Sequence, residues 1–385
     1  MVNQKNAAHP HAIIIAGAGA SAPLGYSTLF DFESAIAKYA PNTTAKEKRE
    51  LSYLFQQVRQ CLVSKGEYTD FEAILWRFSN YLDLCNNIRL DQFLEKEFLS
   101  TIPNRFQHSA FVQKISQGRN IIDRVIVDHY GQPPQNLKAM KTIFEFLKII
   151  IDVNRGVLDY FTTNYDIGLE GIWTNVSNNV RLKTGIKNPL KLLGEWDSRL
   201  LKIEDPNRKG LYVHRLHGCV RWFRHVLKKE SESRHDCKII ANAIPPRDKN
   251  LEACVMYPGR KLHTSEHPFV DSFKRLHSAL SLTTCCIILG TSFRDNNMIE
   301  YLLAANDRRE SPLPIIVINN RNMQPRFFQR IKEVRKKTHF HYTRKDWQIM
   351  FVVGNYLDKS IQEEIISVIH NPSSINIHNE RDATI

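Results

Sequence analysis

Short β-branched runs separated by much longer connections are the feature that most restricts how this chain can fold. The first run, HAIIIA at 11–16, has the length of a buried strand and passes directly into a glycine-rich turn. The later runs are far enough apart for a helix to cross back over a sheet between them. They are VLDYFTTN at 157–164, YVHRLHG at 212–218, CCIILG at 285–290, PIIVIN at 314–319 and, as a further candidate, THFHYT at 338–343. This alternation predicts an α/β fold with a doubly wound parallel sheet.

A block of helical pattern interrupts the alternation. After a break at 40–44, successive segments show apolar spacing near 3.6, and the last of them is MKTIFEFLKIIIDV. We therefore expect a discontinuous Rossmann-like domain formed by residues 10–41 and 154–345, with a mostly helical insertion at 42–153. A C-terminal helical segment at 346–370 and a polar tail at 371–385 complete the expected organisation.

Composition narrows the class of protein further. The 385 residues are 42% hydrophobic and 24% charged, as in an ordinary globular protein. No apolar run is long enough to cross a bilayer, and the start MVNQKNAAHPH lacks the apolar core of a signal peptide. We therefore expect no membrane contact and a cytoplasmic location. The seven cysteines form no C-x-x-C pair, so we expect no zinc and no other metal site.

Part of the formal net charge of +13 is concentrated in one segment, residues 321–345. A basic run of this kind commonly forms a solvated helix face, and the alternative is a surface for nucleic acid or for an acidic partner. The basic residues are Arg321, Arg326, Arg330, Lys332, Arg335, Lys336, Lys337, Arg344 and Lys345.

Polar or glycine-rich motifs follow four of the predicted strands. They are GAGAS at 17–21, TTNYD at 162–166, LHG at 216–218 and GTSF at 290–293. The first fits G-x-G-x-x-A, in which small residues let backbone amides approach a pyrophosphate. Each motif by itself also has a structural explanation, as a tight turn, a strand exit or a helix cap. Because parallel strands end at a common edge of the sheet, the four motifs together predict a ligand site there.

In this order, the motifs resemble the NAD site of the sirtuin superfamily. That site is built from a GAG-S turn, a T-x-N-x-D segment, an H-G pair and a G-[TS]-S motif, and the resemblance covers roughly 10–30 and 156–320. The chain lacks the two C-x-x-C pairs of the protein-deacylating sirtuins, and Thr163 stands where they have glutamine. It is more similar to the sirtuin-like NAD hydrolases of bacterial antiphage defence. Among these it resembles the subunit that assembles with a HerA-like hexameric ATPase.

The resemblance implies NAD as substrate, and the chemistry of its cleavage suggests roles for individual residues. Breaking the nicotinamide glycosidic bond develops positive charge on the ribose, so the site needs a group that orients the nucleophile and a base. Asn164 suits the first role because its amide stays neutral, and His217 suits the second. The expected NAD-binding residues are Gly17, Ala18, Gly19, Ala20 and Ser21 at the pyrophosphate, Asp166 at a ribose hydroxyl, Gly290, Thr291 and Ser292 on the adenosine side, and Asn319 at the adenine ribose.

Three functions are compatible with these residues. The leading hypothesis is an NAD glycohydrolase that releases nicotinamide and ADP-ribose and depletes NAD as an antiphage, abortive-infection effector. The alternatives are a sirtuin-type protein deacylase or ADP-ribosyltransferase, and a non-catalytic NAD-sensing or nucleic-acid-binding scaffold of an ATPase complex. We also expect a homo-oligomer built partly through the apolar residues of 42–153, and a HerA-like ATPase or translocase as partner.

Overall fold

The computed structural model describes the chain in separate stretches. These are 11–26, isolated positions between 44 and 63, 126–176, 179–187, 193–201, 209–225, 240–242, 251–255, 267–338, 342–344 and 346–379. The chain divides into a first unit, which comprises Met1–Tyr26, Pro133–Val255 and Leu262–Ile385, and a second unit, which comprises Ser27–Gln132 and Met256–Lys261. Among the described residues, no helix combines the length and apolar character that a membrane span requires.

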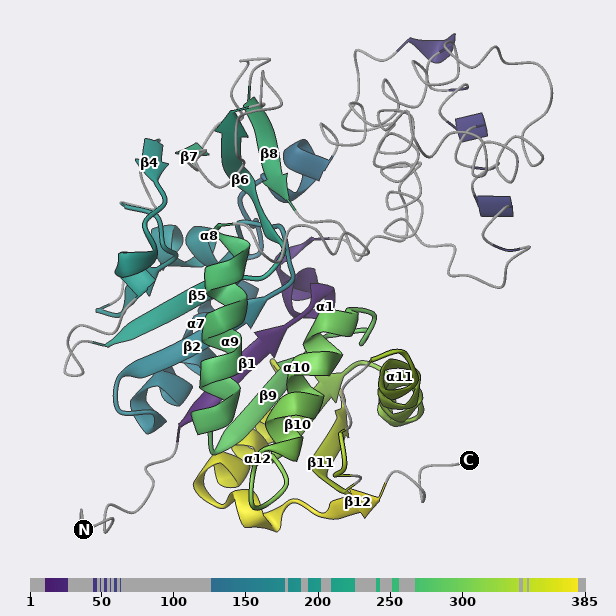
Figure 1. Cartoon of the computed structure of the whole chain (residues 1–385). Helices are drawn as coiled ribbons and strands as arrows, with labels where there is room; N and C mark the ends of the chain where they lie inside the picture. Colours follow the sequence, from purple (N-terminus) through teal and green to yellow (C-terminus); the bar gives the residue numbers. More distant parts are fainter. Residues whose placement is uncertain are drawn as a thin grey trace. The chain divides into compact units, whose positions relative to one another are not determined.

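An eight-stranded sheet forms the centre of the first unit (Figure 1). Its order is β12–β11–β10–β9–β1–β2–β5–β3, and every neighbouring pair is parallel except β11 with β12. The fold class that the sequence predicts, α/β with a mostly parallel sheet, is therefore confirmed. The strands are β1 (Ala12–Ala16), β2 (Val157–Thr162), β3 (Arg181–Lys183), β5 (Gly210–Arg215), β9 (Cys285–Leu289), β10 (Ile315–Asn319), β11 (Asp346–Val353) and β12 (Ile377–Asn379).

β1 is an interior strand of this sheet, and its composition explains the position. Ile13, Ile14 and Ile15 are all completely buried, and Ile14 pairs with Tyr160 of β2 on one side and with Ile287 of β9 on the other. A strand that is covered on both faces needs apolar side chains in both directions, which is why the run is continuous rather than alternating.

Helices cover both faces of the sheet. Figure 1 shows α9 and α10 over one face and α7 and α12 over the other, the arrangement of a doubly wound fold. Their amphipathic patterns account for this packing, since each turns an apolar side toward the strands. The helices are α7 (Leu137–Val153), α8 (Gly168–Asn175), α9 (Phe269–Leu282), α10 (Asn296–Asp307), α11 (Gln324–Lys337) and α12 (Lys359–His370).

The first unit also contains a second, smaller sheet, which is connected to the large sheet where β5 leads into β6. It is antiparallel, with the order β4–β7–β6–β8, and Figure 1 shows β6 and β8 extending away from the large sheet. The sequence did not predict it. Its strands are β4 (Leu193–Glu195), β6 (Gly218–His225), β7 (Ile240–Asn242) and β8 (Leu251–Val255). Only Leu216 and His217 separate the end of β5 from the start of β6, so His217 lies in the link between the two sheets.

Three expectations about the C-terminal part are wrong. The segment 346–370 was expected to be helical, but its first eight residues form β11, whose Trp347 and Ile349 are completely buried. The candidate strand at 338–343 is not one where the structure describes it, at 338 and 342–343. The expected polar tail contributes β12, which pairs with β11 as an antiparallel edge strand. β11 alternates polar and apolar residues because Trp347 and Ile349, which lie on one face of the strand, are its completely buried residues.

The helical insertion also ends earlier than the sequence indicates. The last of its expected helices is α7, which belongs to the sheet unit and packs on β2, and its buried residues include Ile143, Phe146 and Ile150. Its amphipathic pattern shows that it is a helix but not which layer it covers. The expected helices between 62 and 125 lie outside the described residues.

A buried ionic cluster ties α9 to the sheet. Asp159 of β2 accepts hydrogen bonds from His214 of β5 (2.8 Å) and from Arg275 of α9 (2.6 Å). Burial raises the pKa of Asp159, but the bonds to His214 and Arg275 outweigh it and leave the pKa at about 2. The carboxylate therefore stays charged and holds the helix in register with β2 and β5.

Two glycine turns lie backbone against backbone at the edge of the sheet. A Cβ on Gly290 would lie 2.4 Å from the Ala20 nitrogen, and a Cβ on Gly19 would lie 2.8 Å from the Gly290 Cα. Gly290 also has a φ of +57°, which L side chains rarely adopt. The glycines of GAGAS and GTS are thus required for contact between the two turns.

We predict that Gly290→Ala lowers the free energy of unfolding by about 3 kcal/mol or more, because it adds a backbone clash to an unfavourable φ. Urea denaturation of the two proteins measures the difference. Gly25→Ala is the matched control, since Gly25 has a φ of +94° with nothing within 4 Å of its Cβ position. It should cost only about 1 kcal/mol. Equal losses in both variants would contradict the close-contact explanation.

Candidate active site

The motifs that the sequence singled out meet at one edge of the large sheet. They follow the neighbouring strands β10, β9, β1, β2 and β5, and backbone hydrogen bonds join each strand end to the next. These bonds are Gly290 N to Ile318 O (2.9 Å), Gly17 N to Leu289 O (2.8 Å), Thr163 N to Ala16 O (3.0 Å) and Leu216 N to Thr162 O (2.8 Å). The carboxyl edge of an open α/β sheet is the usual place for a ligand, and β1 is where the connections change direction.

The GAGAS turn uses most of its amides inside the protein. Gly17 N donates to Leu289 O, Gly19 N to Gly290 O (2.9 Å) and Ala20 N to Gly17 O (2.9 Å). The expectation that all of these amides face a pyrophosphate is therefore wrong for these three. Ala18 is exposed and its amide makes no hydrogen bond within the described residues, so Ala18 is the backbone donor that the turn presents.

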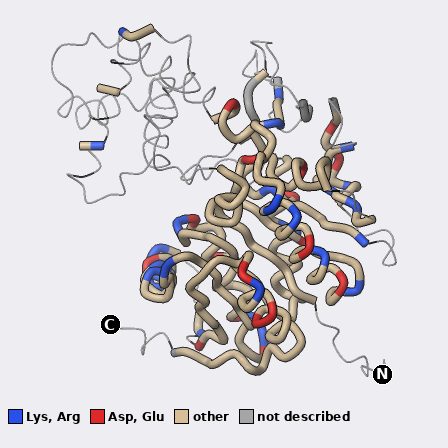
Figure 2. Tube along the Cα trace, turned by 180° about the vertical axis from the view of Figure 1, so that it is seen from behind, with Lys and Arg blue, Asp and Glu red and all other residues tan. Residues whose placement is uncertain are grey.

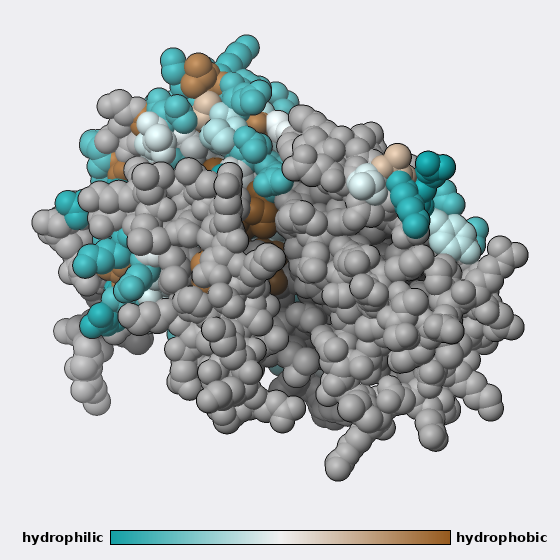
Figure 3. Space-filling model, turned by 90° about the horizontal axis from the view of Figure 1, so that it is seen from above, coloured by the Kyte–Doolittle hydropathy of each residue, from teal (hydrophilic) through white to brown (hydrophobic). Residues whose placement is uncertain are grey.

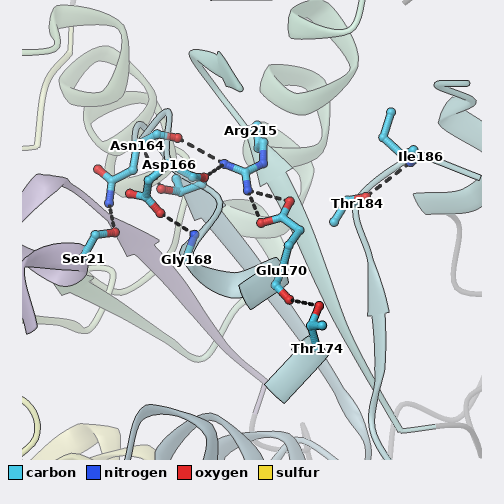
Figure 4. A network of polar contacts seen from close by, with 10 residues as sticks. Ser21, Asn164, Asp166, Gly168, Glu170, Thr174, Thr184, Ile186 and Arg215 are labelled. Atoms are coloured by element: carbon cyan, nitrogen blue, oxygen red, sulfur yellow. Dashed lines mark hydrogen bonds and ion pairs between the residues drawn. The ribbon is translucent and has the colours of Figure 1, made fainter. Parts of the chain in front are cut away.

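Ser21, Asn164 and Asp166 form a connected polar group, shown in Figure 4. The Asn164 side-chain nitrogen donates to Ser21 Oγ (2.8 Å), and Ser21 in turn hydrogen-bonds the Asp166 carboxylate. Asp166 Oδ1 also accepts from the Gly168 amide (2.8 Å). The structure thus brings together the polar residues of GAGAS and TTNYD, as the sequence predicts, and all three side chains are buried.

The bonds of Asn164 leave it only one way to contact a ligand. Its side-chain nitrogen carries two hydrogens, and these are donated to Gly17 O (2.9 Å) and Ser21 Oγ (2.8 Å). The remaining group is the amide oxygen, which can only accept. Asn164 is therefore fixed as an acceptor for the hydrogen of a water or hydroxyl.

Arg215, at the end of β5, holds the TTNYD loop from behind (Figure 4). Its guanidinium Nη1 donates to the backbone oxygens of Asn164 (3.3 Å) and Asp166 (2.8 Å), and its Nη2 donates to both carboxylate oxygens of Glu170 (2.6 and 2.7 Å). Only 2% of Arg215 is exposed. The sequence offered no signal for this role, because the partners are backbone atoms 49 and 51 residues away.

His217 is oriented by an aspartate that the sequence did not identify. Its Nε2 lies 2.9 Å from Asp295 Oδ2, and both side chains are largely buried. The His217 ring lies near that of Tyr165, with 6.3 Å between the centroids, and Val220 N donates to Tyr165 O (3.0 Å). These contacts connect the link that carries His217 to the loop that carries Asn164.

The net pKa shifts of the two site carboxylates are opposite, although burial raises the pKa of both. Burial raises the pKa of Asp166, and the bonds from Ser21, Arg215 and Gly168 only partly offset it. Burial also raises the pKa of Asp295, but the bonds from His217 and the α10 amides outweigh it and the net pKa is lowered. Asp295 is therefore a stable anion, whereas Asp166 carries its charge at a cost in stability.

The residues expected on the adenosine side of NAD lie at the ends of β9 and β10. Asn319 donates from its side chain to Thr291 O (2.9 Å), which joins the ends of β10 and β9. Thr291 is buried, and its hydroxyl accepts from Phe293 N (3.3 Å), whereas Ser292 is exposed. Of this group, Ser292 is the most exposed side chain, and Asn319 is half-buried.

Tyr356, which no sequence motif indicated, is hydrogen-bonded to the GAGAS turn. Its hydroxyl donates to Ala20 O (2.6 Å), and its ring lies beside Phe146 of α7.

No group of three or more His, Cys, Asp or Glu side chains suited to a metal occurs among the described residues. Over the described part of the face in Figure 3, most side chains are hydrophilic.

Comparisons with known proteins give distant structural likenesses alone. No protein-family model matches the chain, and no curated protein matches it. The solved structures with a similar chain include Sir2Tm bound to a propionylated peptide, at 12% identity and a TM-score of 0.32, with 94% of this chain and 93% of that chain covered. A Sir2 homologue–NAD complex has 14% identity and a TM-score of 0.33, with coverages of 85% and 90%. TM-scores of this size are too low to transfer residue roles.

We predict that Asp166→Asn gains stability relative to the native chain as the pH rises from about 4 to about 8. The raised pKa means that the contribution of Asp166 is fully present below the pKa of the unfolded chain and is lost as the pH rises through the folded value. Asparagine does not titrate and escapes this loss. Urea denaturation across this pH range measures the difference.

Asp307→Asn is the control of opposite sign. Burial raises the pKa of Asp307, but hydrogen bonds from Arg344 and Thr343 lower it by more, so the net pKa is lowered. The contribution of Asp307 to stability is therefore fully present above the pKa of the unfolded chain. Relative to the native chain, that variant should lose stability as the pH rises through the folded pKa toward about 4, and the difference should stay constant between about 4 and about 8. A pH-independent difference for Asp166→Asn would contradict the burial effect.

Proposed function

We propose that this chain is a sirtuin-like NAD glycohydrolase that cleaves NAD with water to nicotinamide and ADP-ribose. The observation that carries the proposal is the convergence of GAGAS, TTNYD, LHG and GTS on adjacent strand ends, with Asn164 restricted to accepting and His217 held by Asp295. A packing role alone gives no reason for these two polar side chains to be buried in sequence-distant loops at the same ligand edge.

In the proposed reaction, Asn164 orients the nucleophile. Its free amide oxygen accepts a hydrogen from water and directs the water oxygen to C1′ of the nicotinamide ribose. The new bond joins that oxygen to C1′, and the C1′–N bond breaks with its electron pair passing to the pyridinium nitrogen. Nicotinamide leaves neutral, so the reaction needs no acid at the leaving group.

His217 accepts the proton that the attacking water loses. Since Nε2 faces the Asp295 carboxylate, Nε2 carries a hydrogen and Nδ1 has the lone pair for this proton.

In the same proposal Asp166 binds a ribose hydroxyl, the Ala18 amide and Ser21 lie at the pyrophosphate, and Ser292, Thr291 and Asn319 lie on the adenosine side. The preference for water over an acyl-lysine follows from the lack of paired cysteines for a zinc module.

The role of this activity and its partners are also proposals, supported by the resemblance of the motifs. We propose that the chain acts as an NAD-depleting antiphage effector, that it forms a homo-oligomer, and that it works with a HerA-like ATPase. Free NAD hydrolysis harms a cell, so such an enzyme needs restraint until a partner or an assembly change releases it.

The candidate surface for such a partner, or for nucleic acid, is the exposed part of the basic segment at 321–345. Figure 2 shows Lys and Arg gathered on α11. Arg330 hydrogen-bonds Glu333 and Asn296, and Arg335 hydrogen-bonds the backbone oxygens of residues 342 and 344. These arginines hold the fold together, whereas Lys336 and Lys337 are exposed and available for an acidic partner.

We predict that the purified chain releases nicotinamide from NAD without any acyl or protein acceptor, and that EDTA does not prevent it. Asn164→Ala and His217→Ala should each reduce turnover by a factor on the order of 10² or more, because each removes a group that acts on the reacting atoms. Chromatography of nicotinamide and ADP-ribose measures the rates, and circular dichroism checks that the fold is retained.

His370→Ala is the matched control, since His370 is exposed at the end of α12 and should leave turnover unchanged. Nicotinamide release that requires an acylated peptide or a protein acceptor would favour the deacylase or ADP-ribosyltransferase instead. Absence of release both from the chain alone and with a HerA-like ATPase would contradict the proposal and favour a scaffold.

A further inference from the structure

Asp295, the aspartate that contacts His217, also makes hydrogen bonds to a helix. Asp295 is the N-cap of α10, and its Oδ1 accepts from the amides of Asn297 (2.9 Å) and Met298 (3.4 Å). The other oxygen, Oδ2, lies 2.9 Å from His217 Nε2. One carboxylate therefore joins the start of a helix to the link between β5 and β6.

This double use determines which ring nitrogen of His217 carries the hydrogen. The amides of Asn297 and Met298 require an acceptor, so Oδ1 is committed to the helix. Oδ2 of an ionised carboxylate can only accept, and it therefore selects the imidazole form with the hydrogen on Nε2. The lone pair is then on Nδ1, the nitrogen that the proposed reaction uses.

The loop that carries Asp295 is held rigidly from α11. Arg330 of α11 donates to the backbone oxygens of Phe293 (3.3 Å) and Arg294 (3.3 Å) and to the side chain of Asn296. Phe293, which is completely buried, has a φ of +55° and packs edge-on against Phe327 with 5.1 Å between the ring centroids. A carboxylate on such a fixed loop can orient a neighbouring ring, because its own position is determined on both sides.

We infer that Asp295 is the positioning residue that fixes His217 with its hydrogen on Nε2 and its basic lone pair on Nδ1. The inference rests on the proposed function for its effect on NAD cleavage, but the placement of the hydrogen follows from the contact itself. Among the described residues, the titratable groups with a contact to the His217 ring are Tyr165 and Asp295, and of these two Asp295 is the one that carries a charge at neutral pH.

Asp295→Asn separates this role from helix capping. Asparagine is as good an N-cap as aspartate, and its oxygen must still face the Asn297 and Met298 amides. Its NH₂ group then faces His217 Nε2 and donates to it, which moves the imidazole hydrogen to Nδ1 and removes the base. We expect kcat to fall by a factor on the order of 10²–10⁴, with KM little changed because Asp295 does not contact the substrate.

Asp295→Ser is the companion variant. Serine also caps a helix, but its short side chain leaves Nε2 without a partner instead of reversing the hydrogen. We expect a smaller loss of kcat than with asparagine. Asp358→Asn is the matched control, because Asp358 is the N-cap of α12 and makes no side-chain cap bond there. It should leave kcat unchanged.

Nitrogen-15 NMR of histidine-labelled protein gives a readout that capping does not affect. The spectrum distinguishes protonated from unprotonated ring nitrogens, and His217→Ala assigns the signal. We expect the hydrogen on Nε2 in the native chain and on Nδ1 in Asp295→Asn. Thermal unfolding midpoints of the variants confirm that α10 is retained.

Three results would overturn the inference: a native His217 with its hydrogen on Nδ1, an unchanged tautomer in Asp295→Asn, or a kcat for that variant within about threefold of native. A role in capping alone gives nearly native values for both Asn and Ser. If the native chain does not cleave NAD, the proposed function fails, while the tautomer measurement still decides whether Asp295 places the hydrogen of His217.

Discussion

The contact between the turn after β1 and the turn after β9 is the constraint on which the rest of the site depends. Gly19 and Gly290 approach so closely that neither tolerates a Cβ, and the Gly19 amide is donated to the Gly290 oxygen. This contact brings the end of β1 beside the end of β9 and directs Ser21 toward the loop after β2, where it meets Asn164. The turn therefore acts first as a structural joint between strands, because its Gly17, Gly19 and Ala20 amides bond within the protein, whereas the amide of the exposed Ala18 makes no hydrogen bond among the described residues.

Around this joint, the two proposed catalytic side chains are supported in the same manner. Each uses its other polar atoms on the protein and keeps one acceptor. Asn164 donates both amide hydrogens to Gly17 and Ser21 and keeps its oxygen, and His217 faces Asp295 with Nε2 and keeps Nδ1. Such a site is ordered before any ligand arrives, so binding of the proposed substrate does not require these groups to be rearranged. Arg215 and Glu170 extend the support behind the loop of Asn164.

Much of the fold and part of the site were accessible from the pattern of residues. Continuous apolar runs such as that of β1 identify buried parallel strands, and the motifs after them share an edge because parallel strands share a direction. The expectations failed where burial gives a weak pattern: β11 alternates like a surface segment, β12 is a short edge strand whose Ile377 is exposed, and α7 shows a helical period without showing which layer it covers. The small sheet of β4, β6, β7 and β8 gave no signal above that of a loop.

The sequence by itself determined which residues have chemistry to offer, because an amide, an imidazole or a missing Cβ is a property of the residue type. It therefore identified Asn164, His217 and the turn glycines. Only the tertiary structure decided what those groups are free to do, because hydrogen bonds within the protein remove donors and acceptors from the list. Asp295 lies 78 residues from His217, and Arg215 lies 51 from Asn164, so no local pattern pairs them. The amides of Gly17 and Gly19 were available in the motif and are occupied in the fold, because β9 lies beside β1.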